Sequence, residues 1–455
     1  MAKFRKFSLA ALLCCLASAA AFAQSPLTGE DADSYKQRME WFGKAKLGIF
    51  IHWGIYAVDG VSESWSFYNE RVPYDKYMDQ AKRFTASNYD PKEWVDLIEQ
   101  SGAKYTVLTS KHHDGFALWN TKAGKISAKK SSKAGRDLFT PFVDEVRKRG
   151  DLHLGIYYSL LDWSRDDYPN ATRTKVRYNI KDEPARWEKF KKFNAAQLEE
   201  LNSQYKPDLF WFDGDWEQDA ETWDCKGIIR QLRSTNPNVV INSRIQGYGD
   251  YSTPELGVPV VRPASRYWEL CYTMNDSWGY QHQDTLFKTP QTLLRTFVEC
   301  ISMGGNLLLD IGPKEDGSIP EEEVAILKEF ARWTGKHKEA IYETRAGIPE
   351  NHFHGGYTAL STTGDVLYLY IPGKPNESVD IKGLVNKVKK VWVVGSGCEL
   401  EHYLINDISW SEVPGILYIN VPEKVLDEQI TVIGVQLDGP IRLYRGEGQV
   451  ISVND

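Results

Sequence analysis

Short apolar runs alternate with longer stretches of helical periodicity between residues 45 and 312. Apolar runs bounded by turn residues are typical of buried strands, whereas apolar residues three or four positions apart are typical of helices. The apolar runs predict strands at 47–54, 104–110, 152–159, 208–214, 238–243 and 306–312. The helical periodicity is clearest at 90–101, 184–205 and 319–340. Because strands and helices alternate, we predict a parallel sheet covered by helices.

Nearly every predicted strand ends in polar or ring-bearing residues. These endings read HWG at 52–54, KHHDG at 111–115, YYS at 157–159 and FDGDW at 212–216. In a (β/α)8 barrel the carboxyl ends of the strands and the loops after them form the active face. We therefore predict an N-terminal (β/α)8-like, TIM-type barrel with one pocket at that face.

From about residue 345 the pattern changes to short alternating runs separated by turn residues. Examples are VLYLYI at 366–371 and QITVIGVQL at 429–437. Such runs are typical of an antiparallel β-sandwich. We therefore divide the mature chain into a catalytic barrel at 24–345 and a C-terminal β-sandwich at 346–455.

The first 23 residues have the layout of a secretory signal peptide. Basic residues lie at 3–6, an apolar run at 9–21, and small residues before Gln24. The apolar run is too short to span a bilayer, and no later stretch is long and apolar enough to be a membrane span. We expect residues 1–23 to be cleaved and the mature protein to be periplasmic or secreted.

The charge of the chain argues against a nucleic-acid partner, and the spacing of its cysteines argues against a cysteine metal site. The net charge of −7 comes with no basic block, which argues against nucleic acid as a partner. Two of the six cysteines lie in the signal, and the other four have no metal-type spacing: Cys225, Cys271, Cys300 and Cys398. We expect free thiols or one optional bridge. The fifteen tryptophans and twenty-four tyrosines suit a sugar-binding site, although a large core also uses aromatic residues.

A carboxylate ends the most hydrophobic predicted strand, in LFWFDGDW at 209–216. This residue, Asp213, could be structural, but the loop-rich segment at 242–259 supplies possible partners. They are Arg244, Asp250 and Glu255. Glycoside hydrolysis requires two carboxylates that face one pocket, one as nucleophile or base and one as acid. Asp213 and a carboxylate of this loop would meet that requirement.

Three of the nine histidines, His52, His112 and His113, come from the ends of the first two predicted strands. Imidazoles could bind zinc together with Asp114 or Asp213, so a metal-dependent hydrolase is an alternative that chelator sensitivity would identify. However, the chain has no HxH or HExxH arrangement, and neighbours on an extended chain point in opposite directions. We favour neutral imidazoles that hydrogen-bond sugar hydroxyls, without metal or cofactor.

Several motifs together resemble the α-L-fucosidases of glycoside hydrolase family 29 in order and spacing. They are LGIFIHWG at 47–54, KYTVLTSKHHDGF at 104–116, GIYYSLLDW at 155–163, LFWFDG at 209–214 and NLLLDIGP at 306–313. The resemblance extends over nearly the whole mature chain. It implies a retaining exo-hydrolase that removes terminal α-L-fucose from a fucosylated glycan, with a barrel followed by a β-sandwich and no cofactor.

The resemblance also implies roles for individual residues. Asp213 matches the nucleophile, Glu255 resembles the acid/base, and Glu269 is the alternative acid/base; both are favoured over Asp250. The positions that resemble substrate-binding residues are His52, Trp65, His112, His113, Tyr157, Trp211 and Arg244. In a double displacement, Asp213 would attack the anomeric carbon while Glu255 protonates the departing oxygen and later activates water.

Two positions depart from the family pattern. The loop after the first predicted strand reads SESW, so Trp65 matches, but Ser64 stands where members commonly have Glu. Glu63 could take over that role. Asp310 stands where Asn is usual, and we expect a structural role for it. A catalytically dead fucose-binding protein is the other alternative, while the fucosyl linkage, the natural glycan and the oligomeric state stay open.

Overall fold

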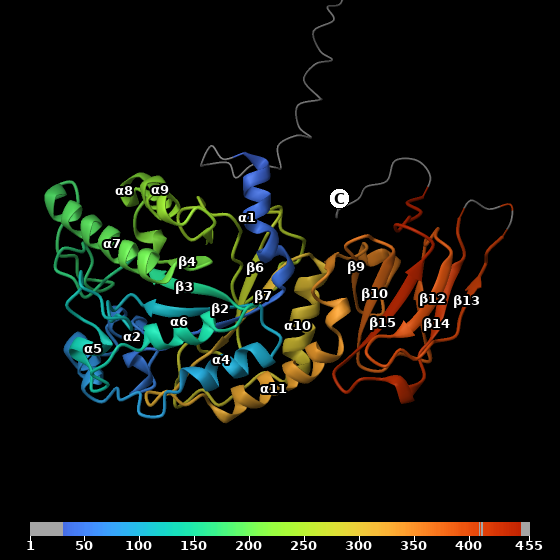
Figure 1. The fold of residues 1–455 in the computed structure, drawn as a ribbon, viewed down its shortest axis with the longest axis horizontal. Coiled ribbons are helices and arrows are strands. Elements are labelled where there is room, and N and C mark those ends of the chain that lie inside the picture. Colours follow the sequence, from blue (N-terminus) through green and yellow to red (C-terminus); the bar gives the residue numbers. More distant parts are fainter. Residues whose placement is uncertain (1–30, 409, 411–412, 447–455) are drawn as a thin grey trace, which may run out of the picture.

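The computed structural model describes residues 31–408, 410 and 413–446, and the predicted signal peptide lies outside the described residues. Seven parallel strands form one sheet in the order β5-β4-β3-β2-β1-β7-β6 (Figure 1). They are β1 (Leu47–Ile51), β2 (Tyr105–Lys111), β3 (His153–Ser159), β4 (Leu209–Asp213), β5 (Val240–Ile241), β6 (Glu269–Thr273) and β7 (Asn306–Ile311). Every residue of β1, β2, β4 and β7 is buried, because helices cover one face of the sheet and the barrel interior covers the other.

Helices connect most of these strands. The three predicted helices are present as α4 (Pro91–Gln100), α7 (Pro184–Tyr205) and α11 (Glu321–Lys336). Asp90 caps α4, since its carboxylate accepts hydrogen bonds from the amides of Lys92 and Glu93. The others are α1 (Ala32–Ala45), α2 (Trp65–Tyr68), α3 (Tyr74–Met78), α5 (Ala128–Ser131), α6 (Phe139–Arg147), α8 (Ala220–Trp223), α9 (Cys225–Thr235) and α10 (Pro290–Ser302).

An irregular segment at 251–255 lies between the two edge strands of the sheet. Tyr251 forms a parallel bridge with Asn242, directly after β5, and Glu255 forms one with Cys271 of β6. The curled sheet is thereby joined from β5 to β6, which confirms the predicted (β/α)8-like fold. The strand predicted at 238–243 shortens to β5, and β6 was not predicted, because the buried Glu269 interrupts its apolar pattern.

The C-terminal strands form two antiparallel sheets, which confirms the predicted β-sandwich (Figure 1). The five-stranded sheet has the order β12-β15-β10-β9-β8 and the three-stranded sheet the order β11-β14-β13. The strands are β8 (Thr344–Ala346), β9 (Tyr357–Ser361), β10 (Val366–Pro372), β11 (Ser378–Ile381), β12 (Val388–Val393), β13 (His402–Ile405), β14 (Ile416–Asn420) and β15 (Ile430–Leu437). Alternate residues of β10, Leu367, Leu369 and Ile371, pack in the core between the sheets.

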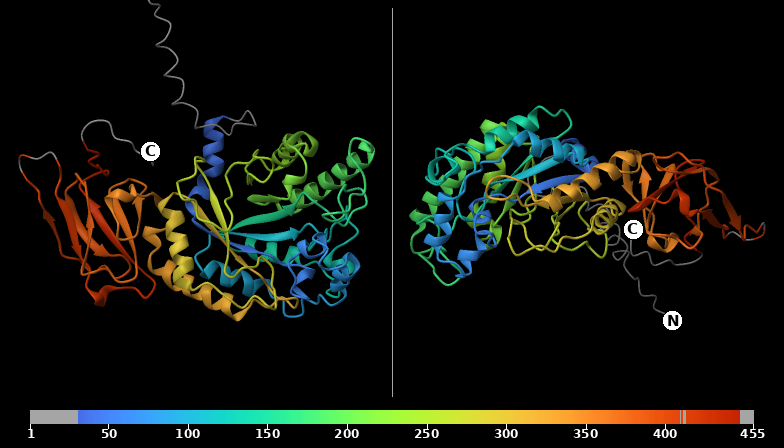
Figure 2. Two further views of the ribbon diagram at one scale, coloured as in Figure 1. Left: turned by 180° about the vertical axis from the view of Figure 1, so that it is seen from behind. Right: turned by 90° about the horizontal axis from the view of Figure 1, so that it is seen from below.

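The five-stranded sheet packs its other face against α10 and α11, which lie between the barrel and the sandwich (Figure 2). Tyr370 and Val432 belong to the same buried cluster as Phe297 and Trp333 of the two helices. The indole N–H of Trp333 donates to the carbonyl of Ile430 over 2.9 Å. The outer face of the five-stranded sheet therefore shares a buried cluster with the barrel helices, whereas the core between the two sandwich sheets is a separate cluster.

Two further features concern the described residues only. No helix in 31–408 or 413–446 is long and apolar enough to cross a membrane. Within the same ranges the four cysteines are free thiols; Cys225, Cys271 and Cys300 are buried and Cys398 is exposed.

Candidate active site

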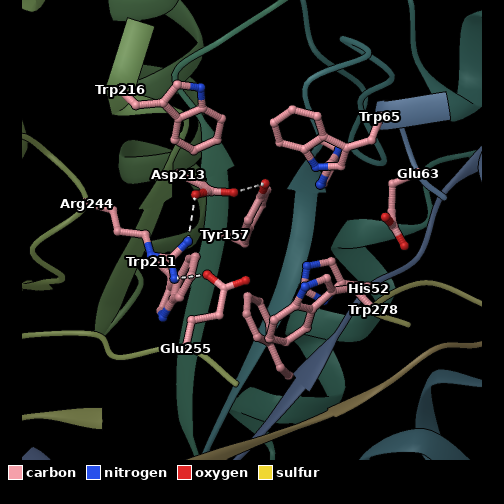
Figure 3. Close-up of a pocket in the computed structure, with 12 residues that line it drawn as sticks. His52, Glu63, Trp65, Tyr157, Trp211, Asp213, Trp216, Arg244, Glu255 and Trp278 are labelled. Atoms are coloured by element: carbon pink, nitrogen blue, oxygen red, sulfur yellow. Dashed lines mark hydrogen bonds and ion pairs between the residues drawn. The ribbon is translucent and has the colours of Figure 1, made fainter. Parts of the chain in front are cut away.

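A cavity of about 280 Å³ lies where the parallel strands end (Figure 3). Most of the predicted site residues surround it, and they come from β3, β4 and the segments after β1, β2 and β5. The lining residues are Phe50, His52, Glu63, Trp65, His112, Tyr157, Trp211, Asp213, Trp216, Arg244, Glu255 and Trp278. The predicted pocket at this face of the barrel is therefore present.

Asp213 is the last residue of β4 and points into the cavity (Figure 3). Directly after it the chain turns at Gly214, whose φ is +82° and where a Cβ atom would lie 2.6 Å from Leu161 Cγ. The Asp213 carboxylate accepts hydrogen bonds from the Tyr157 hydroxyl over 2.9 Å and from Arg244 Nη1 over 3.1 Å. These two bonds fix its orientation and stabilise its negative charge.

Arg244 connects the two candidate catalytic carboxylates. Its Nη1 binds Asp213, while its Nη2 donates to Oε2 of Glu255, and its guanidinium lies 4.6 Å from the ring centre of Trp211. Burial opposes the charge on Arg244, but Asp213 and Glu255 outweigh it and hold its pKa above the ordinary value. The Glu255 side chain is 38% exposed against 12% for Asp213. Water can therefore reach Glu255 more readily than Asp213.

Two of the predicted histidines line the cavity as neutral rings. His52 Nδ1 lies 2.7 Å from Asp310 Oδ1, and His112 Nδ1 lies 2.5 Å from Ser64 Oγ. Burial lowers the pKa of His52 well below its ordinary value, and His112 lowers it further; burial and His113 do the same to His112. Because each Nδ1 has a protein partner, the Nε2 atoms are available to a ligand.

His113 lies behind Asp213 and is not among the lining residues. Its Nδ1 contacts Ser159 Oγ at 2.6 Å, and its Nε2 lies 3.6 Å from Asp213 Oδ2 without a hydrogen-bond partner among the described residues. Burial lowers the pKa of His113 well below its ordinary value. A buried nitrogen without a partner is uncommon, and a substrate hydroxyl next to Asp213 could supply one.

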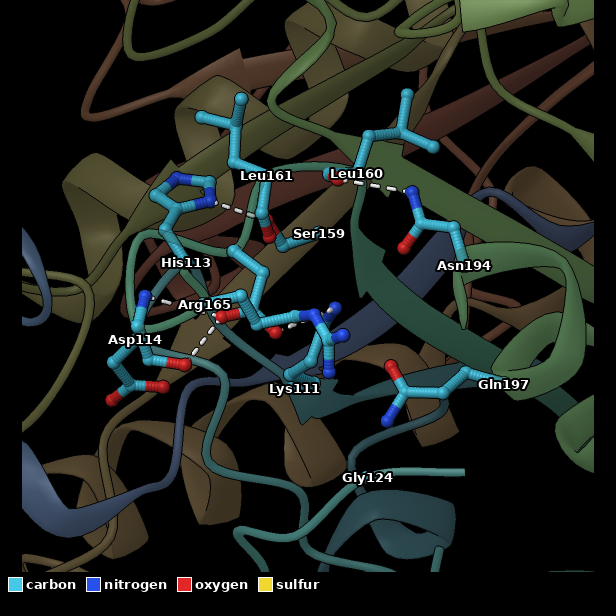
Figure 4. A network of polar contacts seen from close by, with 12 residues as sticks. Lys111, His113, Asp114, Gly124, Ser159, Leu160, Leu161, Arg165, Asn194 and Gln197 are labelled. Carbon is cyan, nitrogen blue, oxygen red and sulfur yellow. Dashed lines mark hydrogen bonds and ion pairs between the residues drawn. The ribbon is translucent and has the colours of Figure 1, made fainter. Parts of the chain in front are cut away.

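A buried polar network supports the strand ends that carry His113 (Figure 4). Lys111 Nζ lies 3.2 Å from the Tyr158 hydroxyl and 3.6 Å from Asp162 Oδ2. Burial lowers the pKa of Lys111 to about 8, although Asp162 counteracts it. Asp114 accepts a hydrogen bond from Tyr77 over 2.6 Å. These residues of KHHDG stabilise the loop and lie outside the cavity.

The carboxylate of Glu63, rather than the side chain of Ser64, reaches the cavity. Glu63 Oε1 accepts a hydrogen bond from the amide of Gly279 over 2.7 Å, and burial raises the pKa of Glu63 to about 7. Ser64 is buried beneath His112, to which its hydroxyl is bonded. The acidic group expected in this loop is therefore present, displaced by one residue.

The two other candidates for the acid/base, Glu269 and Asp250, lie outside the cavity. Glu269 begins β6 in the barrel interior, where it accepts hydrogen bonds from Tyr105 over 2.5 Å and Trp211 over 2.8 Å. Burial raises the pKa of Glu269 to about 7, and the residue does not line the cavity. Asp250 is buried in ion pairs with Arg38 and Arg233, both at 2.8 Å. Neither carboxylate contacts the cavity that Asp213 and Glu255 share.

Three aromatic residues of the site were not predicted: Phe50, Trp216 and Trp278. Phe50 precedes His52 by two positions, so strand alternation places both on one face and could have indicated it. Trp216 follows Asp213 within the same turn. Trp278 follows β6, and because that strand was missed, the residue after it was missed as well.

The arrangement favours acid/base and nucleophilic chemistry at a neutral sugar. In 31–408, 410 and 413–446, no three His, Cys, Asp or Glu side chains are placed to hold a metal ion together. The cavity instead combines two carboxylates on one guanidinium with neutral imidazoles and aromatic walls. A barrel with this carboxylate pair at its carboxyl face defines a glycoside hydrolase.

Comparison with known proteins identifies the family. The sequence profile of the family described as Alpha-L-fucosidase matches residues 14–339. The α-L-fucosidase of Branchiostoma floridae is 30% identical over 416 residues, which cover 81% of this chain and 90% of that protein. Human plasma α-L-fucosidase is 31% identical over 382 residues, or 77% of each chain. The chain therefore belongs to the α-L-fucosidase family, glycoside hydrolase family 29.

Solved structures agree with this assignment. The α-L-fucosidase isoenzyme 1 from Paenibacillus thiaminolyticus matches with a TM-score of 0.80 and 31% identity, covering 89% of this chain and 100% of that one. A family 29 α-L-fucosidase from Bacteroides thetaiotaomicron, trapped as a covalent intermediate with 2-fluoro-fucosyl fluoride, matches with a TM-score of 0.79 and 25% identity over 92% of this chain and 98% of that one. The predicted retaining α-L-fucosidase is confirmed, and the two alternatives are not favoured.

Proposed function

We propose that this protein releases terminal α-L-fucose from fucosylated glycans with Asp213 as nucleophile and Glu255 as acid/base. The observation that supports these roles is the bridge that Arg244 makes between the two carboxylates at the cavity. Asp213 is held rigidly and mostly buried, whereas Glu255 reaches solvent. A nucleophile needs a fixed position, and an acid/base needs exchange with water.

In the first step an Asp213 oxygen forms a bond to the anomeric carbon as the glycosidic bond breaks. The Glu255 carboxyl gives its proton to the departing oxygen, so that the leaving group departs as a neutral alcohol. Tyr157 and Arg244 orient Asp213 for this attack through their hydrogen bonds. The product of the step is a β-linked fucosyl ester of Asp213.

In the second step the Glu255 carboxylate takes a proton from water, whose oxygen attacks the anomeric carbon. The ester bond breaks, Asp213 regains its negative charge, and fucose leaves with its original configuration. Arg244 pairs with both residues, so it can stabilise whichever carboxylate is charged in each step.

The remaining predicted residues would bind the sugar. Neutral imidazoles both donate and accept hydrogen bonds, which suits the hydroxyl groups of fucose. His52 and His112 line the cavity, and His113 Nε2, which has no hydrogen-bond partner in the described part of the chain, lies 3.6 Å from Asp213 Oδ2. Trp65 and Trp211 would form apolar walls.

We also propose separate roles for the three parts of the chain. Residues 24–345 would carry the catalytic site, and residues 346–455 would buttress the barrel through the core shared with α10 and α11. Residues 1–23 would direct export, giving a periplasmic or secreted enzyme.

Hydrolysis of an aryl α-L-fucoside with and without azide tests the catalytic roles. Asp213→Ala should lose activity, and azide should restore turnover by taking the place of the nucleophile, giving β-fucosyl azide. Glu255→Ala should accumulate the intermediate, and azide should intercept it to give α-fucosyl azide. Glu269→Gln is the matched control and should make no azide product. If α-fucosyl azide forms with Glu269→Gln instead, Glu269 is the acid/base; full activity of Asp213→Ala would refute the mechanism.

A further inference from the structure

Trp216 differs from the aromatic residues that form the floor of the cavity. Its side chain is 48% exposed, whereas Phe50, Tyr157 and Trp211 are at most 2% exposed. Trp216 and Glu255 are the most exposed of the residues that line the cavity. These two residues therefore mark the mouth of the cavity, and Trp216 supplies an apolar surface there.

The backbone on both sides of Trp216 is firmly held. Asp215 accepts a hydrogen bond from the amide of Gln246 over 2.6 Å, and its carbonyl accepts one from Trp223 over 2.9 Å. Glu217 accepts hydrogen bonds from four partners: Tyr68, Trp163, Tyr168 and Asn170. Trp216 is the middle residue of the 3-10 helix Asp215–Glu217, and these hydrogen bonds to the residues on either side hold its backbone in place.

The ring of Trp216 is oriented as well. It stacks against Trp65 with ring centres 5.8 Å apart and planes 18° apart (Figure 3). It also meets the His113 ring edge to face at 5.5 Å. Trp65 in turn packs on Trp163 at 5.1 Å. The indole N–H of Trp216 has no acceptor in the described part of the chain. The exposed ring is thus a rigid surface with a free donor at its edge.

We propose that Trp216, supported by Trp65, forms a binding subsite for the group to which fucose is attached, namely a neutral sugar with an apolar C–H face or an aromatic aglycone. This inference rests on the proposed function, in which fucose occupies the inner cavity and Glu255 meets the glycosidic oxygen. The leaving group must then lie at the mouth, where Trp216 is the exposed apolar residue. Because the ring is already fixed, stacking loses little side-chain entropy.

The test compares substrates that differ only in the leaving group. They are α-L-fucosyl fluoride, whose leaving group is a single atom, 4-nitrophenyl α-L-fucoside, and disaccharides of fucose linked to galactose or N-acetylglucosamine. We expect Trp216→Ala to lower kcat/KM about tenfold for the disaccharides and the aryl fucoside, and less than twofold for the fluoride. Trp216→Phe, which keeps an aromatic face, should recover most of the loss. Trp410→Ala, which removes an 85% exposed tryptophan of the β-sandwich, is the matched control and should change none of these values.

Two outcomes would overturn the proposal. An equal loss for fluoride, aryl fucoside and disaccharides would mean that Trp216 shapes the fucose site instead. No loss for any substrate would mean that the ring does not contact the leaving group. Failure of the wild-type enzyme to hydrolyse α-L-fucosyl fluoride would refute the proposed function itself, so the two failures are distinguishable.

Discussion

The hydroxyl of Tyr157 donates a hydrogen bond to Oδ2 of Asp213 over 2.9 Å, from the neighbouring strand of the barrel. The two side chains come from β3 and β4, which pair in parallel, and both are buried. The bond holds Oδ2 of Asp213 in place, and this also fixes the orientation of Oδ1, the other oxygen of the same carboxylate. A tyrosine and a carboxylate at adjacent strand ends thus position the proposed nucleophile.

Tyr157→Phe should lower kcat for an aryl α-L-fucoside roughly ten- to a hundredfold, because a hydrogen bond to a charged group is worth about 1.5–3 kcal/mol. Tyr158→Phe is the control, since the Tyr158 hydroxyl donates to Asn194 on the opposite side of β3. Steady-state kinetics at a temperature where both variants are folded makes the comparison. Equal losses in the two variants would contradict a specific role for Tyr157.

Glu269→Gln should keep most of the activity and become more stable relative to the wild type as the pH rises from 4.5 to 7. Burial raises the pKa of Glu269 from its ordinary value of 4.5 to about 7, so the folded state binds an extra proton between these values. Stability of the wild type should therefore fall from pH 4.5 to 7 relative to the variant, by up to about 3 kcal/mol. Urea unfolding at both pH values measures the difference. A difference that does not change with pH would show that Glu269 is ionised in the folded protein.

Glu63→Gln should change the pH dependence of KM. Burial raises the pKa of Glu63 to about 7, so its carboxyl can donate a hydrogen bond to a substrate hydroxyl below that pH and loses this ability above it. In the wild type, KM for the aryl fucoside should rise as the pH passes 7. In the variant this rise should be absent, because an amide does not titrate and can still accept from Gly279. The same rise in both proteins would assign it to another group.

Asp427→Asn should weaken the contact between barrel and sandwich. Burial opposes the charge of Asp427, but Arg332 and Lys336 of α11 outweigh it and hold its pKa well below the ordinary value. The carboxylate then stabilises the fold fully above the unfolded pKa of about 4, and this stabilisation is lost gradually as the pH falls from that value towards the lowered folded pKa. At pH 7 the variant should lose roughly 1–2 kcal/mol. Thermal unfolding at pH 7 and pH 3 should show a smaller loss at pH 3, because part of the stabilisation has already disappeared there.

The strand tips were the most predictable part of the molecule. The long apolar run at 104–110 covers all of β2 except its last residue, and the run at 306–312 contains β7; side chains after β1, β2 and β4 meet at the cavity. Burial on both faces makes such strands apolar throughout, so the sequence shows them directly. Strand β6 was missed, because its Glu269 is polar, and only the nearby Tyr105 and Trp211 make its burial favourable.

The sequence by itself determined that Asp213 ends a buried strand and that several ring-bearing residues accompany it at one face of a barrel. Only the tertiary structure decided which second carboxylate shares the cavity. Glu255 reaches it because segment 251–255 bridges β5 and β6, whereas Glu269 is held below Trp211. Local sequence fixes the direction of a side chain along its own strand. The contact between Arg244 and two carboxylates from different segments depends on how the barrel closes, which no local pattern specifies.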